Sequence, residues 1–184
     1  AGQVNVATSM RQPGSAIKPV LYATAFHDNL ISPATILWDV PVTYTVTSQQ
    51  EYRPRNYDER FRGPVTARYA LANSYNIPAV KLLYGVTVER MLESARVLGI
   101  PSLFRDSSWY GLSLTLGGGE VTLLDLTTAF QTLSNEGRFT GPVYFLAITD
   151  SQGRPLAGVE QAQTTAQVIS PEAALMAKIP SVLP

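Results

Sequence analysis

Hydrophobic residues recur at intervals of three and four along much of the chain, the spacing that places them on one face of a helix. A capping box formed by Thr122 and Asp125 marks the start of one such helix, and Gly137 marks its stop. The pattern predicts helices over residues 15–26, 64–73, 78–86, 88–98, 122–135 and 172–179. The chain is therefore expected to be mostly helical.

Strand signals are fewer. Residues 2–7 alternate in polarity, and residues 142–156 are typical of a strand that enters a hairpin with its turn at residues 150–153. Residues 30–63 are predicted to be a long irregular segment with a β-prone stretch at 40–47. Because a loop of this length inside a compact domain is usually functional, this segment is a candidate for shaping a binding site.

The composition is typical of a globular domain. The 184 residues are 45% hydrophobic and 15% charged, which is too apolar for a disordered chain and fits one domain or a large piece of one. The 14 basic and 14 acidic residues cancel, so no basic surface for a nucleic acid is indicated. The sequence also has no run of about 18 apolar residues, the length that a transmembrane helix needs.

The absence of cysteine and the scarcity of histidine narrow the possible chemistry. Without cysteine there is no thiolate nucleophile, zinc finger or iron–sulfur cluster, and one histidine cannot build a multi-histidine metal site. That histidine, His27, falls where a helix is ending, so we interpret it as a cation near a helix C-terminus. If the protein is an enzyme, its base is therefore expected to be lysine, aspartate or glutamate.

The stretch RQPGSAIKP, residues 11–19, combines a serine with a lysine one helical turn later. Three residues apart on a helix, Ser15 and Lys18 share a face, so the lysine amine can approach the serine hydroxyl. Pro19 has no N–H to give to the carbonyl of Ser15, which predicts that regular helix begins at about Ser15. There, free backbone N–H groups favour developing negative charge, which suits a nucleophilic serine.

For this chemistry the lysine has to be a neutral amine. An unperturbed lysine has a pKa of about 10.4, so burial or a nearby cation must lower the pKa of Lys18. The serine–lysine pair is a short motif that also arises by chance, and taken alone it is weak evidence for a catalytic site.

A second polar group lies in SYN, residues 74–76. In a helix, Ser74 and Asn76 would point to opposite sides, whereas a turn between helices, which Asn73 and Pro78 suggest, lets both side chains point to one spot. Such a pair is able to relay a proton and to hold a substrate amide. The alternative is an ordinary polar loop in which these residues cap the neighbouring helices.

Three extended blocks resemble one protein family in the family's own order. RQPGSAIKP looks like the S-x-x-K box of class A, bifunctional penicillin-binding proteins, and YRPRNYDERFRGPVTARYALANSYNIPAV, residues 52–80, resembles the stretch that ends in their S-x-N box. The stretch from Leu114 to Leu156 is similar to the family's next segment. Three blocks that cover nearly the whole chain are far more specific than either short motif.

The resemblance implies a serine DD-transpeptidase domain with the penicillin-binding protein and serine β-lactamase-like fold, of the α/β (α+β) class. It implies that Ser15 is the acylated nucleophile, that Lys18 takes its proton, that Ser74 passes a proton to the leaving D-alanine, and that Asn76 binds the substrate amide and positions Lys18. The implied donor is a peptidoglycan stem peptide ending in D-Ala-D-Ala, with an amine of a neighbouring stem as acceptor. β-Lactam antibiotics are expected to acylate the same serine. No metal or organic cofactor is implied, and the implied location is extracytoplasmic, with a membrane anchor outside this chain.

One departure from the family pattern is serious. The family's third box, Lys-Thr-Gly on a strand beside the site, is absent, because neither Lys81 nor Lys178 is followed by Thr-Gly or Ser-Gly. We therefore expect residues 1–184 to be a partial transpeptidase domain, a helical subdomain with part of the central antiparallel sheet. Losing one oxyanion donor alone typically costs on the order of 10²–10³ in rate, so impaired activity is expected for this chain alone.

Some assignments stay open. A non-catalytic penicillin-recognising sensor or scaffold, a D,D-carboxypeptidase or a serine β-lactamase would share these boxes, although no convincing glutamate for β-lactam hydrolysis is found and Glu120 is interpreted as structural. The triple glycine 117–119 lacks the Gly-Lys-Ser/Thr ending of a phosphate loop and is interpreted as backbone turns. Candidates for lining the donor groove are Tyr52, Asn56 and Tyr57, with packing and turn formation as the alternative.

Overall fold

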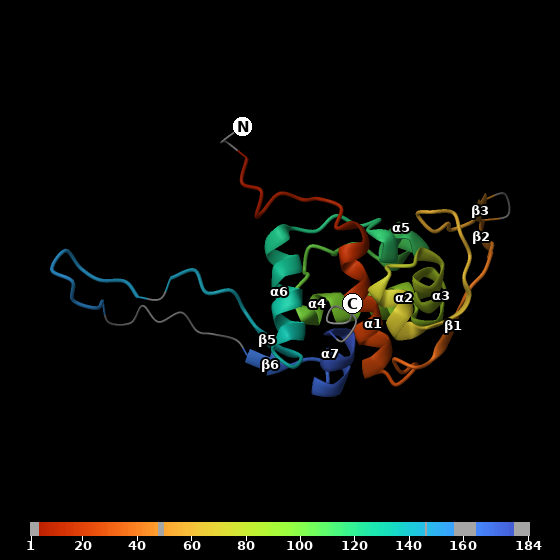
Figure 1. Ribbon diagram of the computed structural model, residues 1–184. Coiled ribbons are helices and arrows are strands. Elements are labelled where there is room, and N and C mark those ends of the chain that lie inside the picture. The colour runs from red at the N-terminus through yellow and green to blue at the C-terminus, as the bar shows by residue number, and fades with distance from the viewer. Residues whose placement is uncertain (1–3, 48–49, 146, 157–164, 179–184) are drawn as a thin grey trace.

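The computed structural model describes residues 4–47, 50–145, 147–156 and 165–178 (Figure 1). Its helical elements are η1 (Gly14–Ile17), α1 (Lys18–His27), α2 (Ala67–Ala72), α3 (Asn76–Val86), α4 (Val88–Leu98), α5 (Ser107–Tyr110), η2 (Gly111–Leu116), α6 (Leu123–Ser134) and α7 (Pro171–Lys178). Its strands are β1 (Ile36–Asp39), β2 (Tyr44–Thr47), β3 (Gln50–Tyr52), β4 (Gly63–Thr66), β5 (Arg138–Thr140) and β6 (Thr165–Gln167). None of the described helices is long and apolar enough to cross a membrane.

Helix α1 lies at the centre of the hydrophobic core, between α6 and α7 on one side and α2 and α3 on the other (Figure 1). Its residues from Val20 to Phe26 are all buried, which is the behaviour of a helix that is apolar on every face. It packs against α3, α4 and α7. Each buried large apolar side chain contributes about 1.5–3 kcal/mol relative to its exposed state, so α1 anchors the fold.

The helices predicted from capping signals are confirmed. Helix α4 covers Val88–Leu98 as predicted and ends at Gly99, which has the left-handed conformation of a C-cap. Helix α6 begins after Thr122, whose side chain accepts a hydrogen bond from the N–H of Asp125 at 3.1 Å. The last helix, α7, is confirmed through Lys178, and residue 179 lies outside the described residues.

The helix predicted over residues 64–73 is wrong in its first part. Residues 63–66 form β4, which pairs antiparallel with β1 so that Pro64 lies opposite Trp38. Proline is tolerated here because the sheet has only two strands and its missing N–H disrupts no inner ladder. The helix begins one residue after Thr66, whose side chain accepts from the N–H of Tyr69 at 3.3 Å.

Of the two other strand predictions, the one at residues 2–7 is wrong within the described residues 4–7, and the one at residues 142–156 holds only close to its turn. Residues 4–9 form a turn instead of a strand, because the carbonyl and side chain of Asn5 accept hydrogen bonds from residues that follow it. In the segment 142–156 the hairpin and its turn are confirmed, by a 3.0 Å bond from Gly153 N to Asp150 O and a 2.9 Å bond from Leu156 N to Ile148 O beside the bridge of residues 149 and 155. The prediction that residues 30–63 are irregular is also wrong, because they contain β1, β2 and β3 and the start of β4. The β-prone stretch 40–47 is confirmed in part, as β2.

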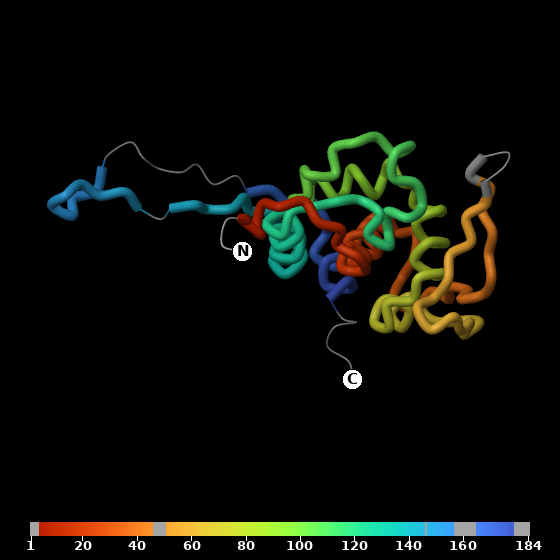
Figure 2. Tube along the Cα trace, turned by 90° about the horizontal axis from the view of Figure 1, so that it is seen from above, coloured from red at the N-terminus to blue at the C-terminus, as the bar shows by residue number. Residues whose placement is uncertain are grey.

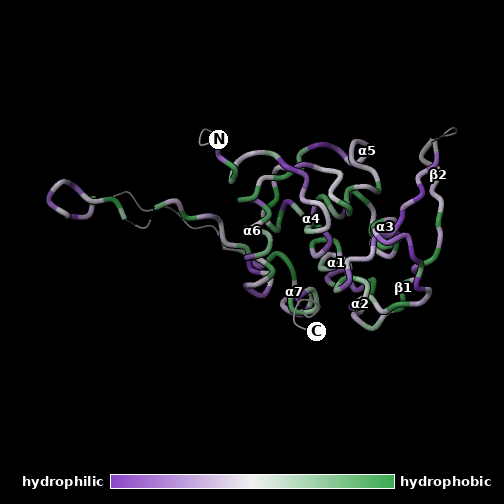
Figure 3. Tube along the Cα trace, turned by 45° about the horizontal axis from the view of Figure 1, so that its top comes forward, coloured by the Kyte–Doolittle hydropathy of each residue, from purple (hydrophilic) through white to green (hydrophobic). Residues whose placement is uncertain are grey.

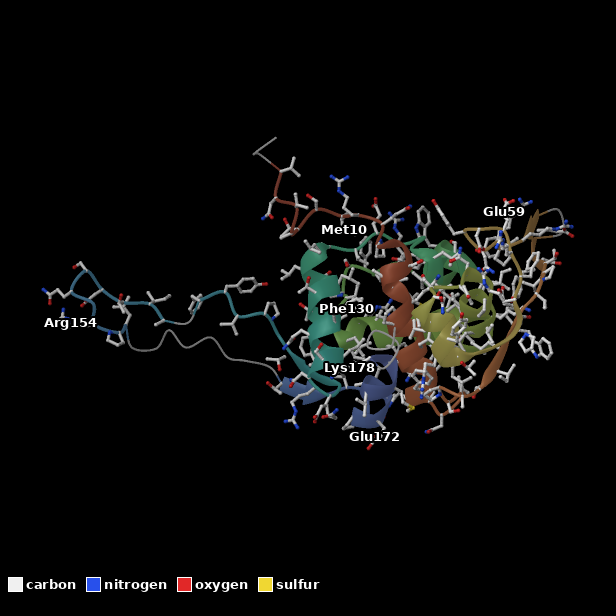
Figure 4. All side chains as sticks on the ribbon, in the orientation of Figure 1. Met10, Glu59, Phe130, Arg154, Glu172 and Lys178 are labelled. Carbon is white, nitrogen blue, oxygen red and sulfur yellow. The ribbon has the colours of Figure 1, made fainter. Side chains whose placement is uncertain are left out.

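An arm that contains the described residues 141–145 and 147–156 projects away from the helices (Figures 1 and 2). Its tip is hydrophilic (Figure 3), and Arg154 lies there, far from Glu59 at the other end of the molecule (Figure 4). The Asp150 carboxylate accepts from the N–H groups of Gln152 and Arg154 and pairs with the Arg154 side chain at 2.7 Å. Local hydrogen bonds therefore maintain this turn.

Gly137, which follows α6, packs against the segment before α7, and its carbonyl accepts from the N–H groups of Val168 and Ile169. Its φ of +75° is a left-handed conformation, and a Cβ atom at this position would lie 2.2 Å from the carbonyl oxygen of Ile169. Gly153 on the arm has a similar φ of +79° but nothing within 4 Å of its Cβ position. Comparing the same substitution at the two glycines therefore separates the free-energy cost of the left-handed conformation from the cost of a steric clash.

We predict that Gly137→Ala destabilises the protein much more than Gly153→Ala. The left-handed conformation alone costs about 1–2 kcal/mol for a residue with a side chain, and the clash with Ile169 adds to it at position 137. Gly137→Ala should lower the melting temperature by about 10 °C, and Gly153→Ala by a few degrees at most. Thermal unfolding of both variants checks this, and equal melting temperatures would contradict the packing assigned to Gly137.

Candidate active site

Ser15 lies in the 3₁₀ turn η1, which runs directly into α1. The N–H of Lys18 donates to the carbonyl of Ser15, and the serine is exposed while the lysine is buried. The start of regular helix at about Ser15, predicted from Pro19, is therefore wrong, because α-helix begins at Lys18. The reason is that the tighter 3₁₀ turn precedes it, in which residues three apart are aligned along the axis.

The turn that carries Ser15 packs against residues 117–121. Gly14 has a φ of +57°, and Gly117 with a φ of +90° packs so closely that a Cβ on it would lie 2.3 Å from the Gly14 nitrogen. On the preceding side, Arg11 and Val121 exchange two backbone hydrogen bonds of 2.9 Å. The prediction that the triple glycine forms backbone turns is confirmed at Gly117, where only glycine permits this approach.

Lys18 is the most unusual residue of the site. Its side chain is 1% exposed, and its amine donates to Ser74 O at 2.6 Å, Ser74 Oγ at 3.1 Å and Asn76 Oδ1 at 2.7 Å. Burial lowers the pKa of Lys18 from its ordinary value of 10.5 to about 8, because the charged form loses hydration. The lowered pKa expected for a lysine base is therefore present.

These three partners also suit the neutral amine. A neutral amine has two N–H donors and one lone pair, and the carbonyl of Ser74 and the side-chain oxygen of Asn76 are strict acceptors that take the two donors. The Ser74 hydroxyl both donates and accepts, so it is able to serve the lone pair. Loss of the proton therefore leaves no polar group of this cluster without a partner.

Ser74 takes the position at which helices usually end in glycine. Its φ of +56° is left-handed, and the bonds from Ser74 N to Leu71 O and from Tyr75 N to Ala70 O form a Schellman motif at the end of α2. A side chain in this conformation is strained, and such strain is typical of functional sites. The prediction of a turn between the helices is confirmed, and α3 begins at Asn76, two residues earlier than predicted.

The structure brings Lys18, Ser74 and Asn76 together, with Ser15 one helical turn away from Lys18. Among the described residues, however, no hydrogen bond joins the Ser15 hydroxyl to Lys18. Every bond of the lysine amine goes to the 74–76 turn. The spacing of three residues therefore indicates proximity, while the contacts with residues far along the chain determine where the amine points.

The three candidates for lining a groove have different surroundings. Tyr57 is fully exposed, and Tyr52 lies half-buried in β3 opposite Tyr44. Asn56 is 5% exposed, and its amide contacts Asp39 on one side and the first turn of α3 on the other. A polar cavity of about 270 Å³ is lined by Asn56, Tyr57, Asp58, Arg62, Asn73, Ser74 and Tyr75. That any of the three touches a substrate remains a prediction.

Sequence reasoning missed Asp39. This carboxylate is fully buried at the end of β1 and accepts two hydrogen bonds from the Asn56 amide, at 2.8 and 2.9 Å. No spacing rule connects residues 39 and 56, because the pairing arises only when β1 and the 53–62 loop fold against α3. The one available signal is an acidic residue inside an apolar, β-prone stretch.

His27 ends α1 as predicted, and its ring also makes a hydrogen bond that the sequence did not indicate. Its Nδ1 accepts a hydrogen bond from the N–H of Ser170 at 3.1 Å, just before α7. His27 therefore helps to attach α7 to α1.

The sequence matches one protein family along almost its whole length. The family model described as penicillin binding protein transpeptidase domain matches residues 2–179. Penicillin-binding protein 1A of Aquifex aeolicus is 40% identical over 148 residues, which is 80% of this chain and 20% of that protein. Penicillin-binding protein 1C of Escherichia coli is 36% identical over 137 residues, 74% of this chain and 17% of that protein. The chain spans about a fifth of the length of these curated relatives.

Solved structures share the fold. Penicillin-binding protein 1A from Haemophilus influenzae superposes with a TM-score of 0.85 over 97% of this chain and 30% of its own, at 24% identity. The PonA1 protein from Mycobacterium tuberculosis, solved in complex with penicillin V, gives 0.82 over 97% of this chain and 48% of its own, at 18% identity. The expected α+β fold is confirmed, as helices with small antiparallel sheets in the described residues.

The buried amine of Lys18 should make the stability of the fold depend on pH. Because the pKa is about 8 in the folded chain and 10.5 ordinarily, unfolding takes up a proton between these values. The contribution of Lys18 to stability is therefore fully present above pH 10.5, declines as the pH falls, and is lost below about pH 8. In the Lys18→Met variant this dependence disappears.

Denaturant unfolding of the wild type and Lys18→Met across this range tests the prediction. Relative to the variant, the unfolding free energy of the wild type should rise with pH by up to about 1.4 kcal/mol per unit. Other groups that titrate in the range are common to both proteins and cancel in the difference. A difference that stays constant with pH would show that Lys18 titrates normally in the folded state.

Proposed function

The chain belongs to the family of penicillin-binding protein transpeptidase domains, and on that premise we propose that it carries the acylation site of a serine D-Ala-D-Ala transpeptidase. The proposed donor is a peptidoglycan stem peptide that ends in D-Ala-D-Ala, and the acceptor is an amine of a neighbouring stem. Penicillins and other β-lactams are proposed to acylate the same serine. We propose further that residues 1–184 form part of this domain, outside the cytoplasm, in a membrane-anchored protein.

The observation that carries the proposal is the buried Lys18 amine bound to Ser74 and Asn76. A base beside a nucleophilic serine must be neutral at the working pH, and a pKa of about 8 leaves roughly a tenth of the amine neutral at pH 7. An ordinary lysine would have less than about one part in a thousand neutral at that pH. Burial therefore supplies a base that a solvent-exposed lysine would not.

In the proposed acylation step, Ser15 Oγ attacks the carbonyl carbon of the penultimate D-alanine while its proton passes to Lys18 Nζ. The tetrahedral intermediate then collapses, the bond from this carbon to the amide nitrogen breaks, and the terminal D-alanine leaves. The leaving nitrogen receives its proton through Ser74 Oγ, which lies 3.1 Å from Lys18 Nζ. The acceptor amine attacks the acyl-enzyme by the reverse route, which restores Ser15 and forms the cross-link.

Asn76 is proposed to serve both the lysine and the substrate. Its Oδ1 accepts from Lys18 at 2.7 Å and its Nδ2 donates to Arg55 O at 2.9 Å. An amide nitrogen has two protons, so one proton remains for a substrate carbonyl. This division of donors and acceptors suits a residue that orients the base and binds a peptide amide together.

A D,D-carboxypeptidase or a β-lactamase would form the same acyl-enzyme as a transpeptidase, whereas a non-catalytic sensor or scaffold need not form one. Labelling of the serine and analysis of the product separate these alternatives. A D,D-carboxypeptidase or β-lactamase transfers the acyl group to water instead of an amine, and a sensor or scaffold forms no turnover product. The proposal of a transpeptidase therefore requires two results: covalent labelling at Ser15, and an acyl product joined to an added amine. The second distinguishes it from hydrolysis.

We predict that fluorescent penicillin labels the full-length natural protein covalently and that Ser15→Ala abolishes the label. Ser9→Ala is the matched control and should leave labelling unchanged, because the Ser9 hydroxyl, among the residues that the structure describes, bonds to Asn5 in the turn near the start of the chain. Gel fluorescence and peptide mass spectrometry locate the adduct. Labelling that persists in Ser15→Ala, or none in the wild type, would overturn the assignment of the nucleophile.

The rate of acylation should rise with pH. Since the neutral form of Lys18 is the reactive one and its pKa is about 8, the second-order rate constant should increase about tenfold between pH 7 and pH 9, with a midpoint near 8. Stopped-flow measurement with a chromogenic β-lactam over this range gives the profile. A rate that is flat or falls with pH would exclude a neutral lysine base.

A further inference from the structure

The N-terminus of α3 is capped by a residue from another part of the chain. Tyr75, the residue at the N-cap position, makes no side-chain cap. Instead, the side-chain oxygen of Asn56 accepts from the N–H of Asn76 at 2.9 Å and of Ile77 at 3.3 Å. These are the first two N–H groups of the helix, which have no partner within it. The loop 53–62 is thus bound to the helix turn that carries Asn76.

The chemistry of the neighbours permits only one orientation of the Asn56 amide. Backbone N–H groups can only donate, so the oxygen must face α3, and a carboxylate can only accept, so the nitrogen must face Asp39. That nitrogen lies 2.8 and 2.9 Å from the two Asp39 oxygens and 2.8 Å from the carbonyl oxygen of Arg60. Since Asn56 and Asp39 are 5% and 0% exposed, water does not compete for these bonds.

Asp39 is itself held in place by the strand that carries it and by Arg62. It is the last residue of β1, opposite Gly63 in β4, and it accepts from the N–H of Arg62 at 3.1 Å. The Arg62 guanidinium lies 3.9 Å from the same carboxylate and stacks over the ring of Tyr75, 4.2 Å from its centroid. The β1–β4 sheet and the 53–62 loop therefore hold the 74–76 turn at two points.

We infer that Asn56 and Asp39 are positioning residues, which hold Asn76 and through it the Lys18 amine in place for Ser15. The contacts run from Asp39 to Asn56, from Asn56 to the first turn of α3, and from Asn76 to Lys18. Neither residue touches the amine itself. The catalytic part of this inference rests on the proposed function, whereas the structural part, control of the 74–76 turn, does not.

An exchange of the two residues tests the inference. Asn56→Asp places two carboxylates against each other in a buried site, and Asp39→Asn offers the Asn56 nitrogen a single oxygen in place of two. In the double variant, Asn56→Asp with Asp39→Asn, the new carboxylate still accepts from Asn76 and Ile77 and now also from the amide at position 39. Two interactions are lost, the bond to the carbonyl of Arg60 and the ion pair between residue 39 and the Arg62 guanidinium.

We expect each single variant to lower the second-order rate constant of β-lactam acylation by about tenfold or more, since a shift of about 1 Å at a catalytic group can cost on the order of 10². The double variant should recover to within about threefold of the wild type, which a pair acting as a unit predicts. The matched control is Asp28→Asn, which removes the Asp28–Arg90 ion pair at the far end of α1. It should lower the melting temperature and leave the rate unchanged.

Hydrogen exchange of the backbone N–H groups of Asn76 and Ile77 in the full-length protein gives a readout independent of activity. Exchange should be faster in both single variants and slow again in the double variant. If Asn56→Asp does not fold, Asp39→Asn, which leaves a neutral buried pair, carries the same comparison.

The outcomes distinguish this inference from the proposed function. Single variants that melt earlier but are acylated at the wild-type rate would show a purely structural role and overturn the inference, while the proposed function stands. A wild type that forms no adduct would overturn the proposed function, and exchange rates at Asn76 and Ile77 would still decide whether Asn56 controls the turn. Unchanged exchange in all variants would refute that control.

Discussion

The structure depends on a buried amine. Lys18 begins the central core helix and is 1% exposed, and a charge there is costly unless all its protons are hydrogen-bonded. The 74–76 turn meets that requirement with two strict acceptors and one hydroxyl, which satisfy either protonation state. If Lys18 were buried without these partners, its charged form would be excluded or the core would open. If it had these partners without being buried, its pKa would stay too high for a base.

Locally unfavourable backbone features accompany the placement of the partners of Lys18. Ser74 adopts a left-handed conformation in which glycine would be easier, a strain on the order of 1–3 kcal/mol, because a glycine would supply no hydroxyl to Lys18. Helix α3 starts without a cap from its own sequence and receives one from Asn56. On the other side, the turn of Ser15 is held by the close approach of Gly117 to Gly14. Each of these three features fixes the backbone near the site, and none of them adds to the hydrophobic core.

The sequence predicts what local chemistry determines. Helix α4, the Thr122 cap and the turn at residues 74–76 follow from spacing and capping residues, and all three are confirmed. The start of β4 at Gly63 could not be predicted from the sequence, because Pro64 suits the first turn of a helix as well as a two-stranded sheet. Only the pairing with β1 determines that the segment is a strand. The Asp39–Asn56 contact joins residues that have no common pattern, so long-range packing alone creates it. The roles assigned to Ser15, Lys18, Ser74 and Asn76 remain predictions.

The most direct test is a crystal structure of the full-length protein after reaction with a penicillin. The account predicts continuous electron density from Ser15 Oγ to the opened β-lactam, with Lys18 Nζ still bonded to Asn76 Oδ1 and to Ser74. It would be contradicted by an adduct on any other residue. It would equally be contradicted by an adduct on Ser15 with the lysine amine turned away from residues 74–76, since the base would then be held by something other than this turn.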